Sequence, residues 1–113
     1  QAAGGAQAAA PAHAGKKVEL DAAADAEVPV QTSENTADLR GLRAHEAVAM
    51  AEQFVDRALG AGLGVVFLIH GHGTGALRDA VRESLRGNRY VARFRSGEQS
   101  EGGGGVTVAW LKW

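Results

Sequence analysis

The chain has 113 residues and a formal net charge of −1, which leaves room for one small domain. It contains no cysteine, so disulfide scaffolds, cysteine-ligated zinc sites and thiol nucleophiles are excluded. No apolar stretch reaches the ~18 residues that span a bilayer, and the alanine-rich start lacks the features of a signal peptide. We therefore expect a cytoplasmic protein that does not enter a membrane.

The charge is divided unevenly along the chain. Residues 1–35 carry two lysines against five acidic side chains, and residues 36–113 carry ten basic and eight acidic ones. Residues 1–15 are rich in alanine and glycine and have no large apolar side chain, so burial cannot offset the entropy of ordering them. We expect residues 1–34 to be a flexible acidic linker or tail and residues 35–113 to form the domain.

Periodic apolar residues begin at residue 36. Residues 36–39 have the composition of a short strand. Residues 43–62 place apolar side chains at three- and four-residue intervals, which predicts an amphipathic helix that ends at its glycines. Residues 64–69 are a continuous apolar run rich in β-branched residues, and such a run predicts a strand buried on both faces.

Two further periodic stretches follow a glycine loop. Residues 76–87 have leucine and valine at four-residue spacing, which predicts a second amphipathic helix. Residues 90–95 alternate, and we expect Tyr90, Ala92 and Phe94 on one face of a strand with arginines on the other. A glycine-rich turn of roughly ten residues then leads to a last strand.

The expected order of elements is β-α-β-α-β-β. Helical crossovers join parallel strands, and the long turn lets the last strand return antiparallel. We therefore predict an α/β fold of two layers, a four-stranded mixed sheet covered by two helices. Ligands of open α/β sheets bind where strand ends lead into helices, so we expect residues 38–41 and 70–75 to lie together at one edge.

The glycine loop, residues 70–75, is suited to an anion. Its glycines let the backbone approach a ligand closely, and the next helix points its unpaired N–H groups and positive dipole end at the loop. The loop lacks the lysine of a P-loop and the spacing of a dinucleotide-binding fingerprint. The arginines that follow can contact a polyphosphate backbone or can form a solvated surface. They are Arg78, Arg82, Arg86, Arg89, Arg93 and Arg95.

Two histidines in this loop, His70 and His72, can exchange protons near neutral pH. Phosphodiester cleavage needs a base, an acid and cations, and these histidines with Asp38 and Arg40 could supply them. Asp38 is also compatible with a divalent ion such as Mg²⁺ or Mn²⁺. A zinc site that includes His45 is a weaker alternative because no cysteine is available. We expect Trp110 to be a core residue rather than a base-stacking one.

Three segments resemble, in order and spacing, the Smr (small MutS-related) domain. They read ADLRGLRAHEA, VVFLIHGHGTGALRDAV and VARFRSGEQSEGGGGVTVAWL, and the resemblance covers about residues 35–111. It is strongest for the form at the C-terminus of the second bacterial MutS family. The resemblance implies a fold similar to the C-terminal domain of translation initiation factor three and binding to nucleic acid. In several members it also implies endonuclease activity, either nicking of DNA or cutting of RNA at stalled ribosomes.

The same resemblance suggests a larger context. Full-length proteins of this MutS type join the domain to an ATPase core, so any ATP dependence would reside outside this chain. They are linked to suppression of recombination or to the splitting of collided ribosomes. We expect the full-length protein to be a homodimer, with the acidic start of this chain as its linker.

Position by position, the family's D-L-[HR]-G motif falls on residues 38–41 and its H-G-x-G-x-G motif on residues 70–75. Many nucleolytic members have histidine where this chain has Arg40, and an arginine clamps phosphate but cannot act as a base. The predicted catalytic residues are Asp38, Arg40, His70 and His72. The predicted phosphate-contacting residues are Arg40, Arg43, Gly71, Gly73, Thr74, Gly75, Arg78, Arg82, Arg93, Arg95 and Glu101.

Three kinds of function are compatible with these observations. The first is a nuclease, and the second is a non-catalytic module that docks on DNA or the ribosome and positions an attached ATPase. The third is a protein-interaction domain. Binding through phosphate contacts weakens steeply as salt rises, whereas a protein-interaction domain would not show this dependence.

Overall fold

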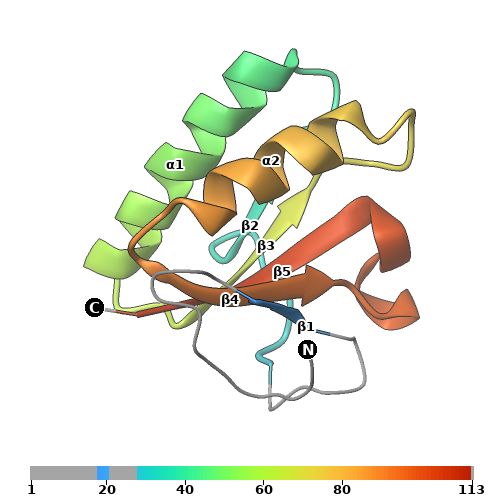
Figure 1. Cartoon of the computed structure of the whole chain (residues 1–113). Helices are drawn as coiled ribbons and strands as arrows, with labels where there is room; N and C mark the ends of the chain where they lie inside the picture. Colours follow the sequence, from blue (N-terminus) through green and yellow to red (C-terminus); the bar gives the residue numbers. More distant parts are fainter. Residues whose placement is uncertain (1–17, 21–27, 113) are drawn as a thin grey trace.

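The computed structural model describes residues 18–20 and 28–112 (Figure 1). Two α-helices and five β-strands make up this part of the chain, with two short 3-10 turns before the last strand. In chain order they are β1 (Val18–Leu20), β2 (Thr36–Asp38), α1 (Ala44–Gly60), β3 (Val65–Ile69), α2 (Ala76–Arg86), β4 (Val91–Ser96), η2 (Gln99–Glu101), η3 (Gly103–Gly105) and β5 (Val106–Leu111).

The strands form one mixed sheet in the order β1-β4-β5-β3-β2. β2 runs parallel to β3, and β5 lies antiparallel between β3 and β4. Helix α1 connects β2 to β3, and α2 connects β3 to β4. Both helices cover the same face of the sheet (Figure 1). The predicted two-layer fold is confirmed.

The sheet has one more strand than the sequence predicts. β1 pairs in parallel with β4, with Val18 opposite Arg93 and Leu20 opposite Arg95. β1 has only three residues and lies in an acidic segment without a periodic stretch beside it, unlike the equally short β2, so this strand could not be found in the sequence. β1 belongs to the segment that we expect to be a linker, and the rest of that segment up to residue 27 lies outside the described residues.

The predicted alternation in β4 is wrong because the strand contains a β-bulge. Val91 lies opposite Leu111, and the register then shifts so that Arg93 lies opposite Trp110. The extra residue places Val91 and Phe94 in the core beneath the helices, and it leaves Ala92 exposed. The arginines of β4 still face the other side of the sheet, as predicted.

The described residues form two apolar clusters, one on each face of the sheet. The larger cluster joins the helices to the sheet and includes fully buried Leu39, Val55 and Val81. The smaller lies on the other face around Phe67 and Val108, and Trp110 packs against it as expected of a core residue. Neither helix in the described part of the chain is long and apolar enough to cross a membrane.

Parallel pairing of β2 with β3 determines where the two motifs lie. Asp38 is the register partner of Ile69, and the N–H of Leu39 donates to the carbonyl of Ile69 at 2.7 Å. Each strand therefore ends at the same edge of the sheet. The turn after β2 and the glycine loop after β3 leave this edge side by side, as the sequence predicts.

Candidate functional site

Glycine at two positions allows the turns at this edge to form. Gly71 has φ +82° and Gly75, which precedes α2, has φ +91°, values that favour glycine. A Cβ on Gly71 would lie 3.3 Å from Cγ of Arg40, and a Cβ on Gly75 would lie 2.7 Å from Nη2 of Arg78. The two glycines therefore let two arginine side chains lie directly on the loop.

Asp38 and Arg40 form an exposed ion pair. The guanidinium donates from Nε to Oδ1 at 2.9 Å and from Nη2 to Oδ2 at 2.7 Å, and the backbone N–H of Arg40 donates to Oδ1 at 3.1 Å. These hydrogen bonds from Arg40 lower the pKa of Asp38 to about 2. Asp38 is therefore charged at neutral pH and is a weak base.

His70 follows β3 and is buried, with 5% of its surface exposed. Its Nδ1 lies 3.1 Å from the carbonyl oxygen of Gly71, and its Nε2 lies 2.8 Å from Oγ1 of Thr107 on β5. Burial lowers the pKa of His70, electrostatic repulsion from Arg82, Arg78 and His72 adds to that effect, and the bond to Gly71 opposes it. The ring is therefore held neutral inside the protein.

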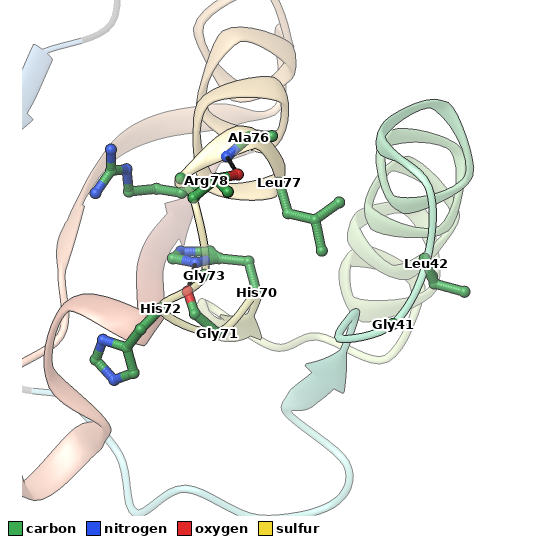
Figure 2. A pocket seen from close by; sticks show the side chains of 11 residues that line it. Gly41, Leu42, His70, Gly71, His72, Gly73, Ala76, Leu77 and Arg78 are labelled. Carbon is green, nitrogen blue, oxygen red and sulfur yellow. Dashed lines mark hydrogen bonds between the residues drawn. The ribbon is translucent and has the colours of Figure 1, made fainter.

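His72 is exposed and leaves the loop in a different direction from His70 (Figure 2). Its ring rests against Gly105, because a Cβ at that position would lie 3.0 Å from Nε2 of His72. A residue other than glycine at position 105 would push this ring away. His72 is the more accessible of the two histidines.

Two hollows flank the glycine loop. The first, of about 300 Å³, extends from the loop to the first turn of α2, where Leu77 and Arg78 point to opposite sides (Figure 2). Arg78 places positive charge beside the N-terminal end of α2, and both features attract an anion. The residues that line this hollow are Gly41, Leu42, His70, Gly71, His72, Gly73, Thr74, Gly75, Ala76, Leu77 and Arg78.

The second hollow, of about 370 Å³, lies between the loop and the η2–η3 turns. Its walls combine the charged or titratable side chains of Arg40, His72 and Glu101 with apolar Ile69 and Val106. Gly71 and His72 line both hollows, so the loop is a shared wall. A ligand in either hollow would therefore lie beside His72.

The sequence profile of the Smr domain matches residues 37–112. The chain belongs to the Smr domain family. Among its relatives, "Endonuclease MutS2" of Pelotomaculum thermopropionicum is 55% identical over 74 residues, which are 66% of this chain and 9% of that protein. "Endonuclease MutS2" of Clostridium botulinum is 46% identical over 79 residues, 70% of this chain and 10% of that protein. The chain thus spans about a tenth of these curated relatives.

Solved Smr structures have the same fold. The Smr domain of Thermus thermophilus MutS2 superposes with a TM-score of 0.68 at 44% identity, covering 70% of this chain and 99% of that one. YdaL of Escherichia coli, a stand-alone small MutS-related protein, has a TM-score of 0.70 at 23% identity, covering 74% and 69%. The second likeness supports the fold alone.

Several predicted phosphate contacts of this Smr domain lie away from the hollows. Arg95 is 1% exposed on the sheet face opposite the helices, and it donates to Glu101 at 2.7 and 3.2 Å. These bonds lower the pKa of Glu101. Arg93 and Arg95 both stack on Trp110, with guanidinium carbons 4.9 and 5.4 Å from the ring centre. In this arrangement Arg95 serves the interior of the domain.

The remaining arginines have different surroundings. Arg43 precedes α1, where its N–H donates to Glu46 at 2.9 Å, and it does not line either hollow. Arg82 bonds to Thr107 and Ser96. Arg86 lies over the ring of Phe94, and Arg89 lies over that of Tyr90. Of the predicted arginines, Arg40 and Arg78 line the hollows.

Sequence reasoning missed the polar residues that support the site from neighbouring elements. Thr107 contacts His70 from β5, and Gln31 and Ser100 line the second hollow. Threonine is common in strands for reasons of propensity, so Thr107 carries no signal of its own. Thr107 alternates with Val106 and Val108 in the last strand, so the sequence shows that it faces the opposite side of the sheet from them. The sequence does not show which residue it contacts on that side.

The described residues do not form a preformed cluster of metal ligands. Among the residues that the structure describes, no group of three or more histidine, cysteine, aspartate or glutamate side chains could hold a metal. Both carboxylate oxygens of Asp38 accept hydrogen bonds from Arg40. A Mg²⁺ ion at Asp38 would compete with this guanidinium for the carboxylate and would take its other ligands from water or substrate phosphate.

Proposed function

We propose that this Smr domain binds nucleic-acid phosphates at the edge formed by residues 38–43 and 70–75 and cleaves a phosphodiester bond there. The observation that carries the proposal is the packing of the two motifs into one surface. The Arg40 side chain lies on Gly71, and both residues line the same hollow as His72. Relatives that match this segment bear the name endonuclease.

The chemistry is divided among the parts of this edge. The N–H groups of the glycine loop and the guanidinium groups of Arg40 and Arg78 stabilise the charge that develops on the phosphate. A water molecule attacks the phosphorus as the bond to the leaving oxygen breaks, and its proton passes to solvent. One of the loop histidines, His70 or His72, donates a proton to the leaving oxygen. Asp38, with its pKa of about 2, holds Arg40 in place and acts as a base only weakly.

A non-catalytic docking module is the second candidate function, and Arg40 favours it. This position is occupied by an arginine that stays protonated and is bound bidentately by Asp38. Such a pair can exchange its carboxylate for a phosphate without any chemical step. The domain would then hold DNA or ribosomal RNA for an ATPase core elsewhere in the protein.

The proposal also covers the full-length protein, on the basis of the family to which this domain belongs. The full-length protein would be a cytoplasmic homodimer that joins this domain to a MutS-type ATPase. It would act in suppression of recombination or in rescue of stalled ribosomes. The Smr domain would supply the contact with nucleic acid in either process.

Cleavage of supercoiled plasmid and of a structured RNA by the purified chain tests the proposal, with Mg²⁺, Mn²⁺ or EDTA and an Asp38→Ala/His70→Ala control. Cutting that disappears in the control supports a nuclease and identifies its substrate. Salt-sensitive binding without cutting supports the docking module. Binding that ignores salt, or no binding, contradicts both and favours a protein-interaction domain.

A further inference from the structure

The hydrogen bonds around His70 determine which ring nitrogen carries its proton. Nδ1 lies 3.1 Å from the carbonyl oxygen of Gly71, and a carbonyl oxygen only accepts, so Nδ1 must be the donor. Burial of the ring and electrostatic repulsion from Arg82, Arg78 and His72 make a second proton unfavourable. Nε2 is therefore unprotonated and accepts a hydrogen bond.

The partner of Nε2 is Thr107, and Arg82 determines how that hydroxyl is oriented. Nε of Arg82 donates to Oγ1 of Thr107 at 3.3 Å, and Nη2 of Arg82 donates to Oγ of Ser96 at 2.6 Å. Because Nε2 of His70 carries no proton, the Thr107 hydroxyl donates to it at 2.8 Å, while Oγ1 accepts from Arg82. The chain of bonds joins α2, β4 and β5 to the loop after β3.

Both nitrogens of His70 are thus used inside the domain. The Nδ1–H bond holds the carbonyl of Gly71, the residue whose positive φ turns the loop beneath Arg40. To protonate a substrate, His70 would have to break one of these bonds. His72 is placed differently, because its ring is exposed and lines both hollows, where a substrate can reach it.

We propose that Thr107, oriented by Arg82, is a positioning residue that holds His70 as the neutral Nδ1–H tautomer, and that His72 is the histidine that meets the substrate phosphate. The part about His72 rests on the proposed function. The part about Thr107 does not, because it concerns a hydrogen-bond network that exists without substrate. His70 then acts as a fixed support for the glycine loop.

Nitrogen-15 NMR of the histidine rings in the full chain tests the tautomer directly. At neutral pH we expect a protonated Nδ1 and an unprotonated Nε2 for His70. Thr107→Val removes the hydroxyl at similar shape, so we expect a shift toward the Nε2–H form, and Thr107→Ser should restore the original signals. A wild-type Nε2–H tautomer, or a Thr107→Val spectrum identical to wild type, would overturn the positioning role.

The wild-type spectrum is decisive even where Thr107→Val fails to fold. Arg82→Lys provides a second variant, because lysine lacks the Nε donor that orients Thr107. We expect it to weaken the preference for Nδ1–H, and an unchanged preference would show that Arg82 does not orient Thr107. Neither measurement depends on cleavage.

Titration with an unstructured DNA oligonucleotide, and with the same sequence as RNA, tests the role of His72. We expect the His72 ring signals to shift on binding, while those of His70 and of the exposed control His45 on α1 stay in place.

His72→Asn should lower cleavage by roughly 100-fold, and His45→Asn should not. A shift at His70 instead of His72 would overturn the assignment. Absence of binding to either oligonucleotide would overturn it together with the proposed function, and the tautomer result would still stand.

Discussion

Two arginine–carboxylate pairs of this domain have the same chemistry and opposite surroundings. In the pair of Arg40 and Asp38 the side chains are 61% and 51% exposed, and in the pair of Arg95 and Glu101 they are 2% and 11% exposed. Both have a contact of 2.7 Å. Water and salt can compete for the first pair, whereas the second is shielded by the sheet and by Trp110.

The difference shows that an arginine's surroundings decide what it can do. Arg40 can give up its carboxylate for a phosphate at little cost, since both groups remain solvated in either state. Arg95 cannot leave Glu101 without exposing a buried charge to an apolar environment. An exposed pair of this kind can serve binding, and a buried one serves the fold.

The largest effect is expected from breaking the buried pair. Arg95→Met leaves the Glu101 carboxylate without its partner, so we expect the free energy of unfolding to fall by about 3–5 kcal/mol. Urea denaturation of the full chain measures this. Arg95→Met/Glu101→Gln removes both charges and should recover much of the loss. Arg40→Ala, the matched change in the exposed pair, should alter stability little. Equal losses from Arg95→Met and Arg40→Ala would contradict the comparison.

The next effect concerns the glycine that supports the exposed pair. Gly71→Ala places a Cβ at φ +82° and 3.3 Å from Cγ of Arg40, so we expect destabilisation by about 1–3 kcal/mol and displacement of the Arg40 side chain. Gly64→Ala is the control, because a Cβ there meets nothing within 4 Å and the residue lines neither hollow. Thermal unfolding measures the first effect, and loss of oligonucleotide affinity measures the second. Similar results for both variants would show that the positive φ of Gly71 is not needed.

The order of the elements was predictable because burial imposes a period on the sequence. The spacing of Leu77, Val81 and Leu85 identifies α2, and Val81 and Leu85 are indeed buried. The bulge at Ala92 shifts the strand by one residue, and the alternating letters around it do not show the shift. Local pattern thus locates elements more reliably than it assigns the faces of a strand.

The sequence predicted where the site lies, but it did not predict the hydrogen-bond and stacking partners of the individual site residues. Both motifs follow strands that pair in parallel, so their meeting follows from topology. The burial of Arg95 depends on Glu101 and Trp110, and the role of His70 depends on Thr107, 37 residues away. Charge and residue type do not reveal such long-range partners. The sequence therefore groups Arg95 with the exposed arginines.

A third prediction sharpens the comparison on the binding side. If Arg40 exchanges Asp38 for a phosphate, Arg40→Ala should weaken nucleic-acid binding and lower the slope of log affinity against log salt by about one. Arg89→Ala, which removes an exposed arginine outside both hollows, is the control for general charge. Fluorescence anisotropy at several salt concentrations measures the slopes. Equal slopes for the two variants would mean that Arg40 contributes only to the overall charge.

The smallest effect is expected in how the two carboxylates, Glu101 and Asp38, influence the stability of the folded protein in acid. The Arg95 guanidinium lowers the pKa of Glu101 from its ordinary value of 4.5, so the folded state binds its proton less readily than the unfolded state. The stability that this pair contributes is therefore complete above about pH 4.5 and is lost as pH falls through the lower folded value. Glu101→Gln should flatten the fall in unfolding free energy in this acid range.

Asp38 also has a lowered pKa, but its carboxylate is solvated, so Asp38→Asn should change the profile less. Urea denaturation between neutral pH and acid compares the variants, and a larger change in Asp38→Asn would show that the exposed pair, not the buried one, stabilises the fold.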